Sequence, residues 1–133
     1  YSTRERQLIP EAIEQRALYF EWMSFISMEL DATSLYVLRR HEGLPEIYSP
    51  APEACLAARA YFERMINAAT VRLEDGRRYL LGEEFFGVDI LMTTVLDWAV
   101  NYGLGLPEAF VAYRERIDDE ASTALAHLAN APT

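Results

Sequence analysis

The chain has 133 residues, 51% of them hydrophobic and 25% charged, which is the composition of one globular domain and excludes a disordered segment. Its formal net charge is −9, with 21 acidic side chains against 12 basic ones, all arginine, so nucleic-acid binding is disfavoured. No apolar run reaches the roughly 18 residues that a membrane-spanning helix needs, and we expect neither a membrane span nor a signal peptide.

The first predicted element is one long helix from Glu11 to Glu42. Pro10 suits the first turn of a helix, and no glycine or proline follows it until Gly43. Apolar side chains recur at helical spacing along this stretch, and residues 39–41 are cations, which a helix C-terminus favours. At 1.5 Å per residue, a helix of about 32 residues extends roughly 48 Å, and we expect a helix this long to bend.

A loop over residues 43–52, rich in proline, separates the first helix from a second one predicted over residues 53–74. After a connection over residues 77–86, a central helix is predicted from Val88 to Tyr102. Its side chains are apolar nearly all the way round. We therefore expect this helix in the middle of the core, with other helices packed around it.

The start of the central helix has its own signal. Asp89 lies three residues after Phe86, so its carboxylate can accept a hydrogen bond from the Phe86 backbone N–H, as a residue at the N3 position of a helix does. Phe85 and Ile90 are spaced to form a hydrophobic staple around this start. The pattern predicts that Asp89 is a structural cap.

The remaining residues predict two short helices. Gly103, Gly105 and Pro107 end the central helix. A short helix is predicted over residues 107–117, and a last, alanine-rich helix over residues 120–129. We find no predicted strand and no internal repeat. Residues 1–133 are thus predicted to form a single all-α domain, with two long helices around a buried central helix plus two short helices.

Two stretches of the chain resemble the C-terminal helical domain of bacterial-type glutathione transferases. The first is Leu81-Gly82-x-x-Phe85-x-x-x-Asp89-Ile90, followed by an apolar helix that carries Trp98-Ala99. The second is the stretch WMSFISMEL, from Trp22 to Leu30, which is similar to a Trp-x-x-Phe-Ile-x-x-Glu-Leu pattern in the first long helix of that family. The resemblance covers essentially the whole chain and implies the glutathione transferase C-terminal-like fold.

The resemblance also implies a function. The parent enzyme would conjugate the thiolate of glutathione, its co-substrate, to a hydrophobic electrophile, and this chain would supply electrophile binding and homodimerisation. The thiol-activating, thioredoxin-like N-terminal domain of the family has no counterpart here, so we expect no catalytic residue in this chain. The alternative is a non-catalytic interaction module, because the same helical domain is attached to translation factors and synthetases as a docking piece.

Candidate binding residues lie on one side of the first long helix. Ser24, Met28, Asp31 and Leu35 follow one another at i, i+4, i+7 and i+11, a spacing that aligns them on one helix face. One interpretation is that this face is simply exposed to solvent. The resemblance implies instead that Ser24, Met28 and Asp31 line, together with Trp98, a cleft that binds the electrophile beside glutathione.

The other chemically capable side chains favour structural roles. Asp97 is expected to pair with an arginine such as Arg78 or Arg116. Neither histidine, His41 or His127, follows a glutamate by three residues as in di-iron bundles, so we expect no metal site. Cys55 is the only cysteine, which excludes an internal disulfide and fits a reducing cytoplasm. It lies near a predicted helix start, where the thiol pKa can fall, but a small buried residue is the preferred interpretation.

Overall fold

The structure is a computed structural model that describes residues 8–130. The described chain is helical and contains no strand; a lone antiparallel bridge joins Tyr79 to Gly82 in the connection before the central helix. The predicted all-α class is therefore confirmed for these residues. None of the described helices combines the length and the apolar character that crossing a membrane requires.

The first long helix is a continuous rod that changes helix type along its length. It consists of α1 (Ile13–Ser24), the π-helical η1 (Phe25–Leu35), α2 (Tyr36–Leu38) and the π-helical η2 (Arg39–Gly43). We call residues 13–43 the N-terminal rod. It begins at Ile13 rather than at Glu11, and otherwise occupies the predicted range.

The π-helical turns of η1 have a local cause in the sequence. The Tyr36 N–H donates to the Asp31 carbonyl, and the hydroxyls of Thr33 and Ser34 donate to the carbonyls five residues before them, at 2.7 and 3.0 Å. Such side-chain bonds compete with the α-helical ladder. The rod buries Tyr19 and Leu35 and, at every fourth position from Trp22, a line of five further side chains: Trp22, Ile26, Leu30, Ser34 and Leu38.

The second long element runs back along the rod. A short helix, α3 (Pro45–Tyr48), occupies part of the predicted loop, and α4 (Pro52–Ala69) follows with Pro52 in its first turn. The tighter 3₁₀ turn η3 (Thr70–Leu73) completes the predicted range. α4 packs along η1 and α2 and contributes the fully buried Phe62 and Ile66 to the core.

The central helix, α5 (Gly87–Asn101), is buried on one side only. Val88, Met92, Leu96 and Ala99 are inaccessible, whereas Ile90, Trp98 and Val100 are between 43% and 49% exposed. The prediction of a helix surrounded on all sides is wrong in this respect. Its contacts are with α1, η1 and the last helix, and no described element covers its other side. The ring of Phe85, just before α5, packs edge-on against Tyr79, at 5.6 Å between centroids.

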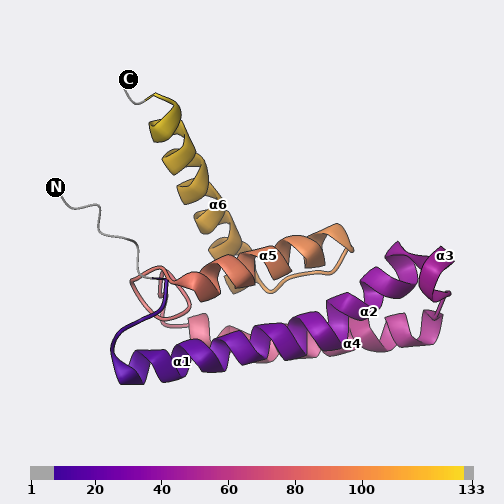
Figure 1. Ribbon diagram of the computed structural model, residues 1–133. Helices are drawn as coiled ribbons and strands as arrows, with labels where there is room; N and C mark the ends of the chain where they lie inside the picture. Colours follow the sequence, from indigo (N-terminus) through magenta and orange to yellow (C-terminus); the bar gives the residue numbers. More distant parts are fainter. Residues whose placement is uncertain (1–7, 131–133) are drawn as a thin grey trace.

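The last element corrects the prediction of two short helices. A single helix, α6 (Glu108–Ala129), spans both predicted ranges, because no glycine or proline interrupts it. Its first half buries Phe110, Tyr113 and Ile117. Figure 1 shows α4 alongside the rod, α5 above them, and α6 rising away from the other helices with its C-terminal half free of them.

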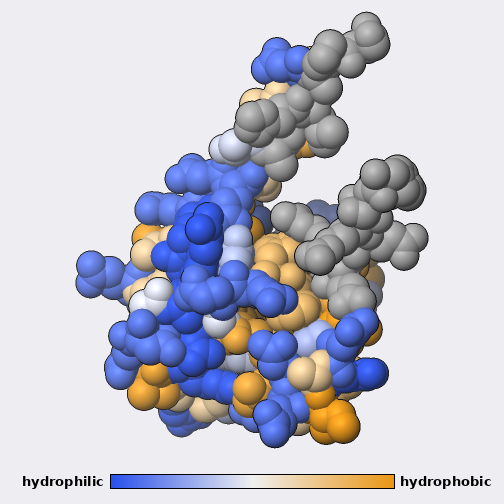
Figure 2. Space-filling model, turned by 90° about the vertical axis from the view of Figure 1, so that its left-hand side faces the viewer, coloured by the Kyte–Doolittle hydropathy of each residue, from blue (hydrophilic) through white to orange (hydrophobic). Residues whose placement is uncertain are grey.

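The surface is largely hydrophilic on the face where α1 begins. Figure 2 shows this face mostly blue, interrupted by smaller orange areas. One ion pair at the surface joins the last two helices: Asp97 of α5 accepts from Arg114 of α6 at 2.7 Å. The predicted pairing of Asp97 with an arginine is thus present, but not with Arg78 or Arg116. Those two are engaged elsewhere, Arg78 with Glu120 and Arg116 with backbone carbonyls.

Candidate functional site

The start of α5 is anchored by the buried carboxylate of Asp89. Its Oδ2 accepts a hydrogen bond from the Phe86 N–H at 2.9 Å, the contact expected of a residue at N3. Its Oδ1 accepts from the Leu80 N–H at 3.0 Å and from the Tyr113 hydroxyl at 2.7 Å. One side chain therefore ties together α5, the preceding connection and α6.

Burial sets the protonation of this anchor. Asp89 is 0% exposed, and its burial raises the pKa of the carboxyl, although the hydrogen bonds from Phe86, Leu80 and Tyr113 act in the opposite direction. Burial and the neighbouring Asp89 charge likewise raise the pKa of the Tyr113 hydroxyl, which stays a donor. The cluster is enclosed and fully bonded, so it holds the fold rather than a substrate.

A groove lies between the N-terminal rod and α5. It has a volume of about 120 Å³. Aliphatic and aromatic side chains form most of its walls, with two opposite charges and the hydroxyls of Tyr36, Thr94 and Tyr102, as is typical of small-molecule sites. Its lining residues are Asp31, Leu35, Tyr36 and Arg39 from the rod, and Leu91, Thr94, Val95, Trp98 and Tyr102 from α5 and its C-terminal end.

The aromatic wall of the groove is ordered. The rings of Trp98 and Tyr102, one turn apart, stack at 5.9 Å with an interplanar angle of 22°. The guanidinium carbon of Arg39 stands 5.8 Å from the Trp98 ring centroid, within cation–π distance. Trp98 is 43% exposed. A flat ligand can therefore reach both this wall and the arginine.

The structure brings two of the four predicted binding residues together. Asp31 and Trp98 line the same groove from opposite walls. Ser24 and Met28 lie farther towards the start of the rod, where both are exposed, and they are not part of the groove lining. Because the buried line of the rod repeats every four residues, side chains four residues apart lie on one line along it. Ser24 and Met28 thus share a line with Ala32, whereas Asp31 shares a different line with Leu35 and Arg39.

Sequence reasoning placed Leu35 on the same helix face as Asp31 but missed the other groove residues. Arg39 was interpreted only as a cation suited to a helix end, although it continues the line of Asp31 and Leu35 at the same spacing. Tyr102 follows Trp98 by four residues, a spacing that places two rings on one helix face. Both signals were present in the sequence.

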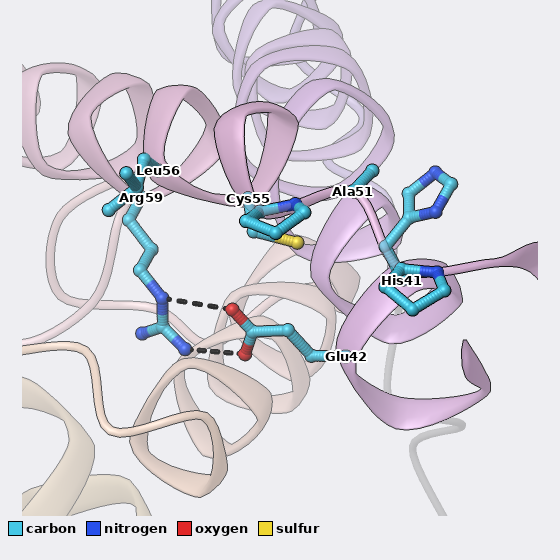
Figure 3. A pocket seen from close by; sticks show the side chains of 8 residues that line it. His41, Glu42, Ala51, Cys55, Leu56 and Arg59 are labelled. Atoms are coloured by element: carbon cyan, nitrogen blue, oxygen red, sulfur yellow. Dashed lines mark hydrogen bonds and ion pairs between the residues drawn. The ribbon is translucent and has the colours of Figure 1, made fainter.

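A second hollow, of about 430 Å³, opens at the other side of the rod's C-terminal end. Figure 3 shows the carboxylate of Glu42 and the guanidinium of Arg59 pointing toward one another, with the sulfur of Cys55 beside them. The Arg59 Nη2 donates to Glu42 at 2.6 Å, and its Nη1 donates to the Tyr102 carbonyl at 2.8 Å. These charges are already paired within the protein.

Cys55 is not poised as a nucleophile in this hollow. It is buried, as the preferred interpretation of its sequence position predicted. Burial raises the pKa of its thiol, and the nearby Glu42 carboxylate raises it further, because both disfavour the thiolate. His41 lines the same hollow, and its Nδ1 donates to the Ser49 carbonyl at 2.7 Å. The hollow therefore holds a neutral thiol beside a closed ion pair.

Two further observations bear on the kind of site. Within residues 8–130, the side chains that the structure describes form no group of three or more His, Cys, Asp or Glu able to hold a metal ion; the side chain of His127 lies outside that description. No protein family model, curated protein or solved structure matches the chain. The groove geometry is thus the main guide to function.

Proposed function

We propose that the chain is the electrophile-binding and dimerisation domain of a glutathione transferase. The parent enzyme would conjugate the thiolate of glutathione to a hydrophobic electrophile. The observation that carries this proposal is the groove, because Asp31 and Trp98, selected by resemblance to that family, line it together. The buried cap of Asp89 at the start of α5 is consistent with the same family pattern.

The groove is suited to bind rather than to react. Leu35, Leu91 and Val95 offer apolar surface, and burying a ligand's apolar part there contributes roughly 25 cal/mol per Å². The groove contains no thiol, and the buried Cys55 belongs to the other hollow. In the parent, the glutathione sulfur would form the C–S bond while the leaving group departs from the electrophile. The groove would hold that electrophile in place.

Nuclear magnetic resonance titration tests this proposal. S-hexylglutathione added to the isotope-labelled chain should shift the indole signal of Trp98 and the amides around Asp31. Because residues 1–133 would supply only the electrophile-binding part of such a site, we expect a Kd on the order of millimolar, about −4 kcal/mol. Trp22, which is only 1% exposed, supplies an internal reference signal. Shifts confined to α6, or a Trp98 signal that moves no more than that of Trp22, would contradict the proposal.

Activity and association provide separate checks. The isolated chain should conjugate glutathione to a general electrophile no faster than the uncatalysed rate, since thiol activation is assigned to another domain. Turnover by the pure chain would overturn that assignment. We also expect a homodimer that dissociates on dilution, by mass action. Sedimentation at micromolar and millimolar concentrations should show this shift, and a strict monomer at the higher concentration would contradict it.

One observation favours the second candidate, a non-catalytic interaction module. The C-terminal half of α6 projects from the body (Figure 1), and its Leu125 is 67% exposed. Under this alternative, the groove has no ligand of its own, and S-hexylglutathione leaves the Trp98 signal unchanged. The same titration therefore separates the two candidates.

A further inference from the structure

Arg39 has no acidic partner among the residues that the structure describes, although the chain is acidic overall. Five other arginines, at positions 59, 72, 77, 78 and 114, form ion pairs with carboxylates. Among the residues that the structure describes, no carboxylate lies within ion-pair distance of Arg39. Its guanidinium lies over the ring of Trp98. Its charge is therefore available at the groove, and its side chain is exposed.

The neighbouring Arg40 strengthens the positive potential at this end of the groove. Its guanidinium lies 5.6 Å from the ring of Tyr36 and 4.6 Å from the ring of Tyr48. It too makes no ion pair within residues 8–130, and its Nε is buried without a hydrogen-bond partner. Two adjacent cations are thus held by aromatic rings instead of by acids, on a chain whose net charge is −9.

The groove has an opposite charge further along the rod. Asp31 lies two helical turns before Arg39 and lines the same groove. Its carboxylate makes no ion pair with any described residue. Between the two charges, Leu91 and Val95 provide apolar wall. A ligand that carries a single negative charge would therefore be oriented, with its anionic group toward Arg39 and away from Asp31.

From this arrangement we infer that the groove selects aromatic carboxylates, with Arg39 as the carboxylate-binding residue. This inference rests on the proposed function, in that it names the class of ligand the groove takes. A guanidinium presents a planar fork of N–H donors that matches a carboxylate, and stacking on Trp98 fixes its plane. The 120 Å³ of the groove is comparable to the cavity of about 150 Å³ that holds benzene in another protein.

Three ligands of nearly equal shape test the inference: phenylacetate, neutral phenylacetamide and cationic phenethylamine. Binding to the full chain is followed by the Trp98 indole signal. We expect phenylacetate to bind about five-fold more tightly than phenylacetamide, the ratio that corresponds to one exposed ion pair of about 1 kcal/mol. Phenethylamine should bind more weakly than phenylacetate. Added salt should weaken phenylacetate binding and leave phenylacetamide binding unchanged.

Variants that remove either the positive or the negative charge of the groove sharpen the test. Arg39→Gln should remove the advantage of phenylacetate over phenylacetamide, and Arg39→Lys should retain part of it. Asp31→Asn should increase the affinity for phenylacetate, because it removes a repelling charge. Arg64→Gln is the matched control: it changes the net charge equally, but Arg64 stands over Tyr61 on α4, outside the groove. It should leave the ratio unchanged.

The outcomes separate this inference from the proposed function. If phenylacetate and phenylacetamide shift Trp98 with equal affinity, or if Arg64→Gln lowers the ratio as much as Arg39→Gln, the inference is wrong while the groove remains a ligand site. If none of the three ligands and no glutathione conjugate shifts Trp98, the proposed function fails and the inference fails with it. If Arg39→Gln binds phenylacetate no more tightly than phenylacetamide, and still binds phenylacetamide as the unmodified chain does, the inference and the proposed function are both supported.

Discussion

Replacing Asp89 by alanine is expected to lower the free energy of unfolding by about 3 kcal/mol. The carboxylate is fully buried and accepts hydrogen bonds from two backbone N–H groups and from the Tyr113 hydroxyl, at 2.7 to 3.0 Å. Alanine leaves the Leu80 and Phe86 N–H groups without an acceptor and leaves the Tyr113 hydroxyl only the backbone carbonyl at position 89, 3.5 Å away. Each of the three lost bonds contributes about 1 kcal/mol or more. The substitution also removes the unfavourable desolvation of a buried carboxylate, and this gain limits the loss of unfolding free energy to about 3 kcal/mol.

Urea unfolding measures this change, and the same helix offers a control. Asp97→Ala removes a carboxylate that is 53% exposed and paired with Arg114 at the surface, so it should cost about 0.5 kcal/mol or less. Because Asp89 and Tyr113 share a bond, Asp89→Ala combined with Tyr113→Phe should cost less than the sum of the two separate losses. If the urea midpoint of Asp89→Ala is no lower than that of Asp97→Ala, with the same dependence of unfolding free energy on urea concentration, Asp89 does not anchor the start of α5.

Three further outcomes follow from the same geometry. Burial raises the pKa of Asp89. The stability that this shift contributes is therefore present below the ordinary aspartate pKa of about 3.9 and is lost as pH rises through the raised pKa. In denaturant titrations, the loss of unfolding free energy caused by Asp89→Asn should shrink with rising pH. Cys55 should react with an aromatic disulfide reagent far more slowly in the native protein than after unfolding, and Glu42→Gln should speed this slow native reaction by lowering the thiol pKa. Equal native rates would contradict the role of Glu42. Arg59→Met should lower the unfolding free energy by about 1–2 kcal/mol through the loss of its bonds to Glu42 and to the Tyr102 carbonyl. Arg64→Met should leave the unfolding free energy unchanged.

Much of the fold could be predicted because its signals are local. Long stretches without glycine or proline marked the rod and α4, and the spacing of Asp89 from Phe86 marked the start of α5. The division of α6 into two helices was wrong, because no glycine or proline interrupts Glu108–Ala129 and nothing in that stretch ends the helix. The open side of α5 could not be predicted from its apolar pattern, since that pattern does not say whether another element arrives to cover it.

The groove was harder to predict because its residues converge only in three dimensions. Trp98 and Asp31 were linked by family resemblance, not by any local rule. Arg39 was overlooked because a cation near a helix end already has a local explanation. Ser24 and Met28 were grouped with Asp31 on an α-helical spacing of i+4 and i+7, but the π-helical turns of η1 change which residues share a line.

Those π-helical turns keep the groove straight. In a pure α-helix, a step of four residues exceeds one turn by about 40°, so the four steps from Trp22 to Leu38 would rotate a buried line by about 160°. A π-helical turn contains more residues than an α-helical turn and offsets this rotation. The buried line and the line from Asp31 to Arg39 can thus both run parallel to the rod axis. Deleting a single residue within Phe25–Leu35 would rotate every later side chain by about 100° around the rod axis. We therefore expect this segment to accept substitutions at its exposed positions far more readily than any change in its length.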